Sequence, residues 1–316
     1  MSEHVTHIAV AEDSARVAFY DPDFSPIFRQ CIERFPNAVR WGSTSRSGDT
    51  FILPMIEKWR DEWQDTAEQQ EKLAYIIGWA GHLAGDRTFK PVFRITDLAY
   101  YVRGYPGPSH ASVYHDAIMM HEVFDDGNRA PFHPNILNPM LKGHPAADVV
   151  PVNKIENAFA MSFGNDMAQF KKFLTGDRNK EQSFLENTDA EMQKFYVEMD
   201  RYTEAYCNPD LAMLRKYILN PNFYDRSDQI IQIAEQMKMG VMPDISLQDA
   251  IEASKEQSLY AQALALGHQF YMAASDFFHK KISKEEAMKK SRTFQAHKQQ
   301  LSYYIEQAEK ENTKQQ

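Results

Sequence analysis

The segment 66–86, TAEQQEKLAYIIGWAGHLAGD, narrows the choice of fold more than any other part of the chain. Its first turns are polar and the remainder is almost continuously apolar, which predicts a central helix with a buried second half. His82 and Asp86 fall in that half and, being four residues apart, share one helix face. An ionised carboxylate buried among apolar side chains is costly unless a cation compensates its charge. The segment therefore predicts a helical core that carries a candidate metal site.

A simpler interpretation of the same residues needs no metal. Asp86 and Lys90 are also four residues apart, so they can form an ion pair along the helix while His82 is hydrogen-bonded inside the core. The spacing alone favours neither interpretation.

Helical patterns also dominate the rest of the chain, and strand signals are weak. Residues 5–20 predict a first helix with His7 in its opening turn. Residues 26–48 predict a short helix and then a turn rich in glycine and serine, which brings Asp49 next to a helix start. Further helices are expected after a cap at Ser109 or Ser112, and over 190–207, 210–218, 227–238 and 247–279.

These patterns predict an all-α, single-domain multi-helix bundle over 1–316. Its metal-site half spans about 1–126, and 152–316 adds a helical C-terminal part. Between them, about 127–151 holds five prolines and no clear period, which predicts a long loop.

A second set of possible ligands lies on the predicted helix with the sequence VYHDAIMMHEVFDD. At about 100° per residue, His115, His121, Glu122 and Asp125 fall on one arc, with apolar residues opposite. His121 and Asp125 are four residues apart and His115 and Glu122 are seven apart, so either pair could clamp a metal. The alternative is a solvated polar face.

Charge and cysteine content argue against several classes of function. The chain has 35 basic and 44 acidic residues, a net charge of -9, so broad attraction to nucleic acid or anionic lipid is not expected. No stretch approaches the roughly 18 apolar residues of a membrane span, and Met1–Ala18 lacks a signal-peptide pattern, so we expect a cytoplasmic protein. Cys31 and Cys207 match no metal-binding spacing and are expected to be reduced.

Four short motifs, THIAVAED, GSTSRSGD, GWAGHLAGDRTFKP and HEVFD, together resemble the zinc-dependent phospholipase C family, which is related in fold to the single-strand-specific zinc nucleases. The resemblance covers about the first 126 residues. It implies a helical bundle with two or three zinc ions and a ligand set carried over by motif: His7, Asp49, His82, Asp86, His121 and Asp125. Two family histidines have no counterpart within 51–81 and 87–93, and His115 is the best replacement, ahead of Glu122, His110 and His133.

The resemblance implies a metal-dependent hydrolase that attacks a phosphodiester or a phospholipid-like substrate with metal-activated water. Asp49 is the candidate catalytic residue, binding metal and orienting or deprotonating that water. Two other classes stay open. Replacement of histidines by carboxylates would favour iron or manganese and a non-hydrolytic chemistry, and loss of ligands would leave a non-catalytic helical binding protein. Nucleic acid is expected only as a substrate, and 247–279 could support a homo-oligomer.

Overall fold

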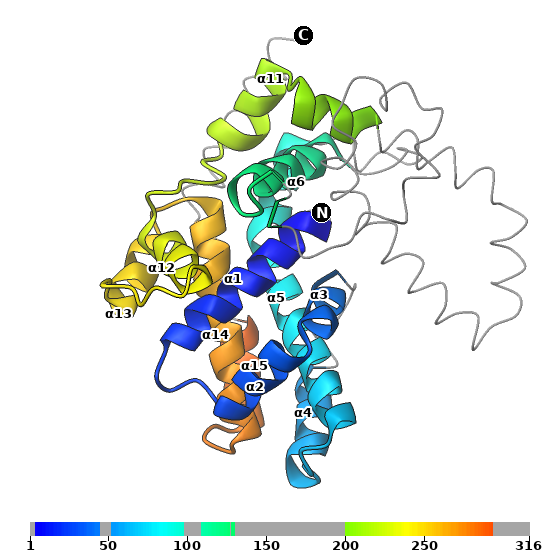
Figure 1. Cartoon of the computed structure of the whole chain (residues 1–316), viewed down its shortest axis with the longest axis vertical. Helices are drawn as coiled ribbons and strands as arrows, with labels where there is room; N and C mark the ends of the chain where they lie inside the picture. Colours follow the sequence, from blue (N-terminus) through cyan, green and yellow to red (C-terminus); the bar gives the residue numbers. More distant parts are fainter. Residues whose placement is uncertain (1–3, 45–51, 98–108, 127, 130–199, 293–316) are drawn as a thin grey trace, which may run out of the picture. The chain divides into compact units, whose positions relative to one another are not determined.

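The computed structural model describes residues 4–44, 52–97, 109–126, 128–129 and 200–292. Every regular element in these ranges is a helix and none is a strand, which confirms the all-α prediction (Figure 1). None of the described helices is both long and apolar enough to cross a bilayer. Asp49, His133, the predicted loop apart from 128–129, and the tail from 293 onward lie outside the described residues.

The chain divides into two compact units. One, the α5 unit, joins Thr6–Thr96 with Leu219–Gln316; the other, the α6 unit, joins Met1–Val5 with Asp97–Ile218. The single-domain organisation over 1–316 stays a prediction.

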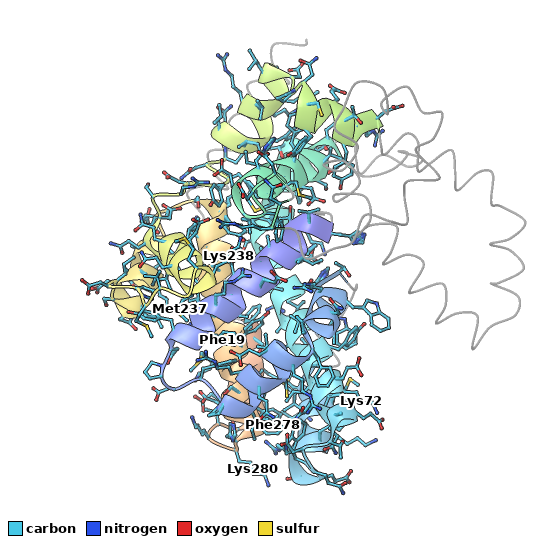
Figure 2. All side chains as sticks on the ribbon, in the orientation of Figure 1. Phe19, Lys72, Met237, Lys238, Phe278 and Lys280 are labelled. Carbon is cyan, nitrogen blue, oxygen red and sulfur yellow. The ribbon has the colours of Figure 1, made fainter. Side chains whose placement is uncertain are left out.

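The α5 unit is built around one long helix. This helix, α5, runs over Ala67–Thr96 and packs against α3 and α14. The described helices of the unit are α1 (His4–Tyr20, whose first two residues belong to the α6 unit), α2 (Pro26–Arg34), α3 (Pro36–Thr44), α4 (Ile52–Asp61), α5, α12 (Gln229–Lys238), α13 (Leu247–Ser254), α14 (Leu259–Phe278) and α15 (Lys284–Arg292). Phe278 is buried, whereas Lys72 and Lys280 lie at the surface in ion pairs with acidic partners (Figure 2).

Helix α5 is longer than its sequence pattern predicts and continues to Thr96 through Pro91. A proline inside a helix removes one backbone hydrogen bond and normally bends or ends the helix. Here Phe89, Val92 and Phe93 are buried on both sides of the proline. Burial of these side chains offsets the lost bond, so the helix carries on past the expected end at Asp86.

Two glycines allow α3 and α5 to touch backbone to backbone. A Cβ on Gly78 would lie 2.0 Å from the Val39 carbonyl oxygen, and one on Gly42 would lie 2.0 Å from the Tyr75 carbonyl oxygen. Residues 42–44 are therefore helical, although the sequence suggested that they begin a turn. The packing of Gly42 against α5 supplies the contact that extends α3.

Serine caps begin three of these helices. Ser25 precedes Pro26 at the start of α2, and Ser246 and Ser258 accept backbone N–H groups at the starts of α13 and α14. The stretch 247–279, expected to be continuous, is thus two helices. The break is fixed at Ser258, whose own N–H donates to Asp228 Oδ2 at 3.1 Å.

The described part of the α6 unit consists of α6 (His110–Glu122), a helix over 200–207, the short α11 (Leu211–Leu214) and the π-helix η4 (Arg215–Leu219), whose last residue belongs to the α5 unit. The cap of α6 is Ser109, which accepts the Ser112 N–H at 3.0 Å. Asp116 is buried and accepts from Tyr202 Oη at 2.8 Å. This bond ties the helix over 200–207 to α6.

Candidate metal centre

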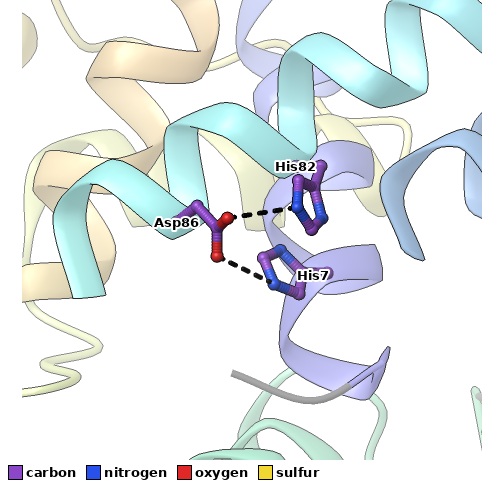
Figure 3. A group of neighbouring side chains, drawn as sticks. All are labelled: His7, His82 and Asp86. Carbon is purple, nitrogen blue, oxygen red and sulfur yellow. Dashed lines mark ion pairs between the residues drawn. The ribbon is translucent and has the colours of Figure 1, made fainter. Parts of the chain in front are cut away.

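Three side chains with metal-binding atoms meet in the interior of the α5 unit. His82 and Asp86 lie one turn apart on α5, and His7 reaches them from α1 (Figure 3). Their exposed fractions are 4, 8 and 3 per cent, respectively. Within the described residues, they form the one group of three or more histidine, cysteine or acidic side chains spaced for a metal.

The carboxylate of Asp86 faces both imidazole rings. His82 Nε2 lies 3.2 Å from Asp86 Oδ2, and His7 Nε2 lies 3.7 Å from Asp86 Oδ1. One ligand atom from each residue lies within 4.8 Å of the other two. Two ligand atoms bound to one tetrahedral zinc are about 3.4 Å apart. The spacing of the three side chains is therefore close to that of a ligand set.

His82 is held by a backbone carbonyl from α3. Its Nδ1 lies 2.9 Å from the Ser43 oxygen, and because a carbonyl can only accept, Nδ1 carries the hydrogen. Metal-binding histidines commonly donate their second ring N–H in this way, which fixes the ring and aims the other nitrogen at the metal. The bond thus orients Nε2 toward Asp86.

Counting donors and acceptors around His82 calls for a positive charge between Nε2 and Asp86 Oδ2. A neutral imidazole has one N–H, and Nδ1 gives it to Ser43. Nε2 would then direct a lone pair at a carboxylate oxygen 3.2 Å away. A cation bound between the two atoms would remove this repulsion, and the Lys90 ammonium already lies at the same Oδ2.

His7 packs directly on His82. The two rings are stacked with centroids 4.2 Å apart and an interplanar angle of 24°. Gly85 leaves the room for this arrangement, since a Cβ there would lie 3.0 Å from His7 Nδ1. Helix α1 approaches α5 closely because the facing residues, Ala11 and Gly81, are also small.

Lys90 adds a fourth group, because its ammonium forms an ion pair with Asp86 Oδ2. Burial raises the pKa of Asp86, but the hydrogen bond from His82, the nearby imidazoles and Lys90 outweigh it and hold that pKa well below its usual range. The Asp86–Lys90 ion pair of the metal-free interpretation is therefore present. The same carboxylate also lies in a group with His7 and His82 whose spacing could hold a metal, and metal binding itself stays a prediction. Asp86 Oδ1 accepts no hydrogen bond from the described part of the chain.

The donor set suits a divalent transition metal. Two imidazole nitrogens and one carboxylate occur in catalytic zinc sites that leave a position open for water, and in iron sites that keep several positions open. The preset orientation of His82 and the unbonded Asp86 Oδ1 both fit such an ion. His7, His82 and Asp86 would hold it, and Lys90 would have to yield Asp86 Oδ2 if the metal took that oxygen.

In the described part of the α6 unit, the other predicted ligands form no group of three side chains spaced for a metal. His115 is 1 per cent exposed and donates from Nε2 to the Tyr217 carbonyl at 3.0 Å. Burial lowers the pKa of His115 to about 3. His121 is exposed, and Glu122 ends α6. Neither joins His115 in a group of three.

The predicted pairing of His121 with Asp125 is not found, because the helix ends before Asp125. Both Asp125 and Asp126 adopt positive φ values, 50° and 55°, so the 3.6-residue repeat no longer applies. His121 Nδ1 instead contacts Asp126, which also accepts from Tyr206 Oη at 2.7 Å. Asp125 faces Arg129 at 3.8 Å.

Sequence reasoning missed two features of these sites. The Ser43 carbonyl is a backbone group, and no residue type marks it. Tyr206, which stacks on His121 with centroids 4.2 Å apart, is distant in sequence and carries no motif.

No family model, curated protein or solved structure matches this chain.

Proposed function

We propose that the chain is a metal-dependent hydrolase of a phosphodiester or phospholipid-like substrate, with His7, His82 and Asp86 as the metal ligands. The observation that carries the proposal is the buried cluster of two imidazoles and one carboxylate, with His82 already oriented by Ser43. The choice of hydrolysis and of phosphoesters comes from the resemblance to zinc-dependent phospholipases C. The helical fold agrees with that family, and the phospholipase C or zinc nuclease type of bundle is part of the proposal.

A zinc ion held by three protein ligands would lower the pKa of a bound water to about 7 and would polarise a phosphoryl oxygen. The chain's contribution is to hold the His82 ring in place through the Ser43 carbonyl and to bury Asp86 away from bulk water. Lys90 is one-third exposed and, once released from Asp86, carries a charge suited to an anionic phosphoester. Asp49 keeps the proposed role of orienting or deprotonating the attacking water.

A second candidate is a redox metalloenzyme that uses iron or manganese. Its support is the donor set itself, since two histidines and one carboxylate form the ligand set of many non-haem iron oxygenases. Metal analysis and the visible spectrum of purified protein separate it from a zinc hydrolase.

Metal binding is tested first by removing any metal with a chelator and then titrating the metal-free protein calorimetrically with zinc, ferrous and manganous ions. We expect one strong site and a higher unfolding temperature in the presence of the bound metal, because a ligand of the folded state stabilises it. His82→Ala should lose both effects. His268→Ala is the matched control, because His268 is also a buried helical histidine next to an aspartate, but it lies on α14 and pairs with Asp21 at 2.9 Å.

Hydrolysis is then assayed with bis(4-nitrophenyl) phosphate and with phosphatidylcholine vesicles. Activity that follows the metal content and disappears in His82→Ala and Asp86→Ala supports the proposal. A protein that binds no metal, with a melting temperature unaffected by chelator, would leave the cluster as an ion-pair network of a non-catalytic protein.

A further inference from the structure

A separate cavity lies in the α5 unit, between α4, α5, α14 and α15. Its volume is about 210 Å³. None of His7, His82 and Asp86 lines it. On α5 its walls come from Ala80, Leu83 and Arg87, which at about 100° per residue lie on the arc next to the one that carries His82 and Asp86. The cavity is thus a second candidate binding site.

The walls are mainly apolar and come from buried positions. Leu53 of α4, Leu83 of α5 and Phe270 of α14 are 6, 8 and 2 per cent exposed, and Met288 of α15 completes the ring of helices. An apolar cavity of about 150 Å³ can hold a benzene molecule. The space here therefore admits an apolar group somewhat larger than one benzene ring.

Two of the described residues that line this cavity are charged, and both are cationic: Arg87 and Lys284. The Arg87 guanidinium carbon lies 5.2 Å from the centroid of the Phe270 ring, so the charge is held beside an apolar wall. Lys284 forms an ion pair with Glu57. Ligand pockets typically combine such apolar walls with a few polar groups that fix orientation.

We propose that this cavity binds a small organic anion, with an apolar body among Leu53, Leu83, Phe270 and Met288 and its carboxylate or phosphate group at Arg87. The apolar walls favour the body of such a molecule, and the guanidinium favours a planar or tetrahedral oxyanion, to which it can donate two parallel hydrogen bonds. A neutral or cationic molecule of the same size has no partner for Arg87.

The test is isothermal titration of the full-length protein with four probes that share an eight-carbon chain: octanoate, octyl phosphate, octanol and octylammonium. We expect octanoate or octyl phosphate to bind about tenfold or more tightly than octanol, since hydrogen bonds to charged groups are the stronger class. Octylammonium should bind most weakly. The better of the two anions identifies the acid group that the site takes. Equal binding of all four probes, or no binding of any, would overturn the proposal.

Two kinds of variant locate the bound probe. Arg87→Met keeps an apolar side chain and removes the charge, so anion binding should weaken about tenfold while octanol binding is unchanged. Arg29→Met is the matched control, because Arg29 also lies over a phenylalanine ring, with 4.9 Å between its guanidinium carbon and the Phe19 centroid. If Arg87→Met binds octanoate as tightly as Arg29→Met does, the anion is not at Arg87.

Ala274→Leu fills the cavity from α14 and should abolish binding with the unfolding temperature kept or raised. Met288→Trp fills it from the half-buried side of α15 and replaces the first variant if that one unfolds. Retention of binding by a folded filled variant contradicts the proposal.

Chelation separates this site from the metal centre. Octanoate should bind with its wild-type affinity both to protein stripped of metal by a chelator and to His82→Ala, because neither change touches the cavity walls. Binding that disappears in both would place the carboxylate on the metal and would overturn the assignment to Arg87.

Discussion

The carboxylate of Asp86 faces two imidazole rings and one ammonium group inside the α5 unit. Each of these partners favours the charged form of the carboxylate, and together they outweigh the cost of its burial. Lys90 and a metal ion would compete for Oδ2, while Oδ1 faces His7. If the proposed site binds a metal, Lys90 would therefore set how readily the metal is accepted.

Lys90→Met should raise metal affinity about fivefold, because it removes a competing cation from a partly exposed ion pair worth up to about 1 kcal/mol. The metal-free variant should be less stable than wild type, since Asp86 loses a partner. Calorimetric titration with zinc measures the affinity and urea denaturation measures the stability. Lys72→Met is the control, because it removes the ion pair between Lys72 and Glu68, which has the same i,i+4 spacing on α5. A lower zinc affinity in Lys90→Met would mean that Lys90 supports the metal site.

His115 gives the α6 unit a pH-dependent stability. Its pKa falls from 6.5 to about 3 on folding because the ring is buried. The unfolded chain therefore takes up a proton that the folded chain refuses, so this residue destabilises the fold increasingly as the pH falls from 6.5 toward 3. At pH 5 the penalty is about 2 kcal/mol.

His115→Gln should remove this penalty, because glutamine can still donate to the Tyr217 carbonyl but does not titrate. Urea midpoints at pH 7 and pH 5 test it: the fall between the two should be smaller in the variant than in wild type. His268→Gln serves as a comparison for another buried histidine. If the urea midpoint falls equally in wild type and in His115→Gln between pH 7 and pH 5, His115 is not the source of the pH dependence.

At the scale of helices, glycine positions decide how close α1 and α3 come to α5. Gly78 meets a carbonyl oxygen of α3, which cannot move alone, whereas Gly85 meets the His7 ring of α1, which can rotate. The same helix thus has one glycine needed for packing and one needed for the site. Because Gly78 also lies against the Ser43 backbone, its contact helps to place the carbonyl that holds His82.

Gly78→Ala should destabilise the protein by more than about 2 kcal/mol, because the added Cβ would lie 2.0 Å from the Val39 oxygen and force α3 away. Gly85→Ala should change stability little, since alanine's better helix propensity offsets a mild clash, but it should weaken zinc binding by displacing His7. Chemical denaturation and zinc titration of both variants check the contrast. Equal effects on stability would contradict it.

Helical periodicity predicted α1, most of α5 and α12, and the four-residue spacing predicted that His82 and Asp86 share a face. It could not predict that α5 passes through Pro91, because burial of Phe89, Val92 and Phe93 decides that. It also placed Asp125 on the same helix face as His121, although α6 ends at Glu122. The meeting of His7 with His82 depends on how α1 packs against α5, which residue spacing along the chain does not encode.

At the scale of the whole molecule, the division into two units separates two ligand sets. His7, His82 and Asp86 belong to the α5 unit, whereas His115, His121, Glu122 and Asp125 belong to the α6 unit. The resemblance to zinc-dependent phospholipases C implies that His121 and Asp125 also bind metal. A measurement that reports on each helix can tell whether His7, His82 and Asp86 alone bind the metal or whether ligands from α6 take part.

Hydrogen exchange with and without zinc is that measurement. Ligand binding slows exchange in the elements that must open for the ligand to leave. We expect zinc to protect the amides of α1 and of α5 around His82 and Asp86, and to leave α6 unchanged, because three ligands within one unit suffice for a site with an open position. His82→Ala should lose the protection of α1 and α5. Equal protection of α6, lost in the His121→Ala variant, would instead mean that the α6 unit supplies ligands to the same metal.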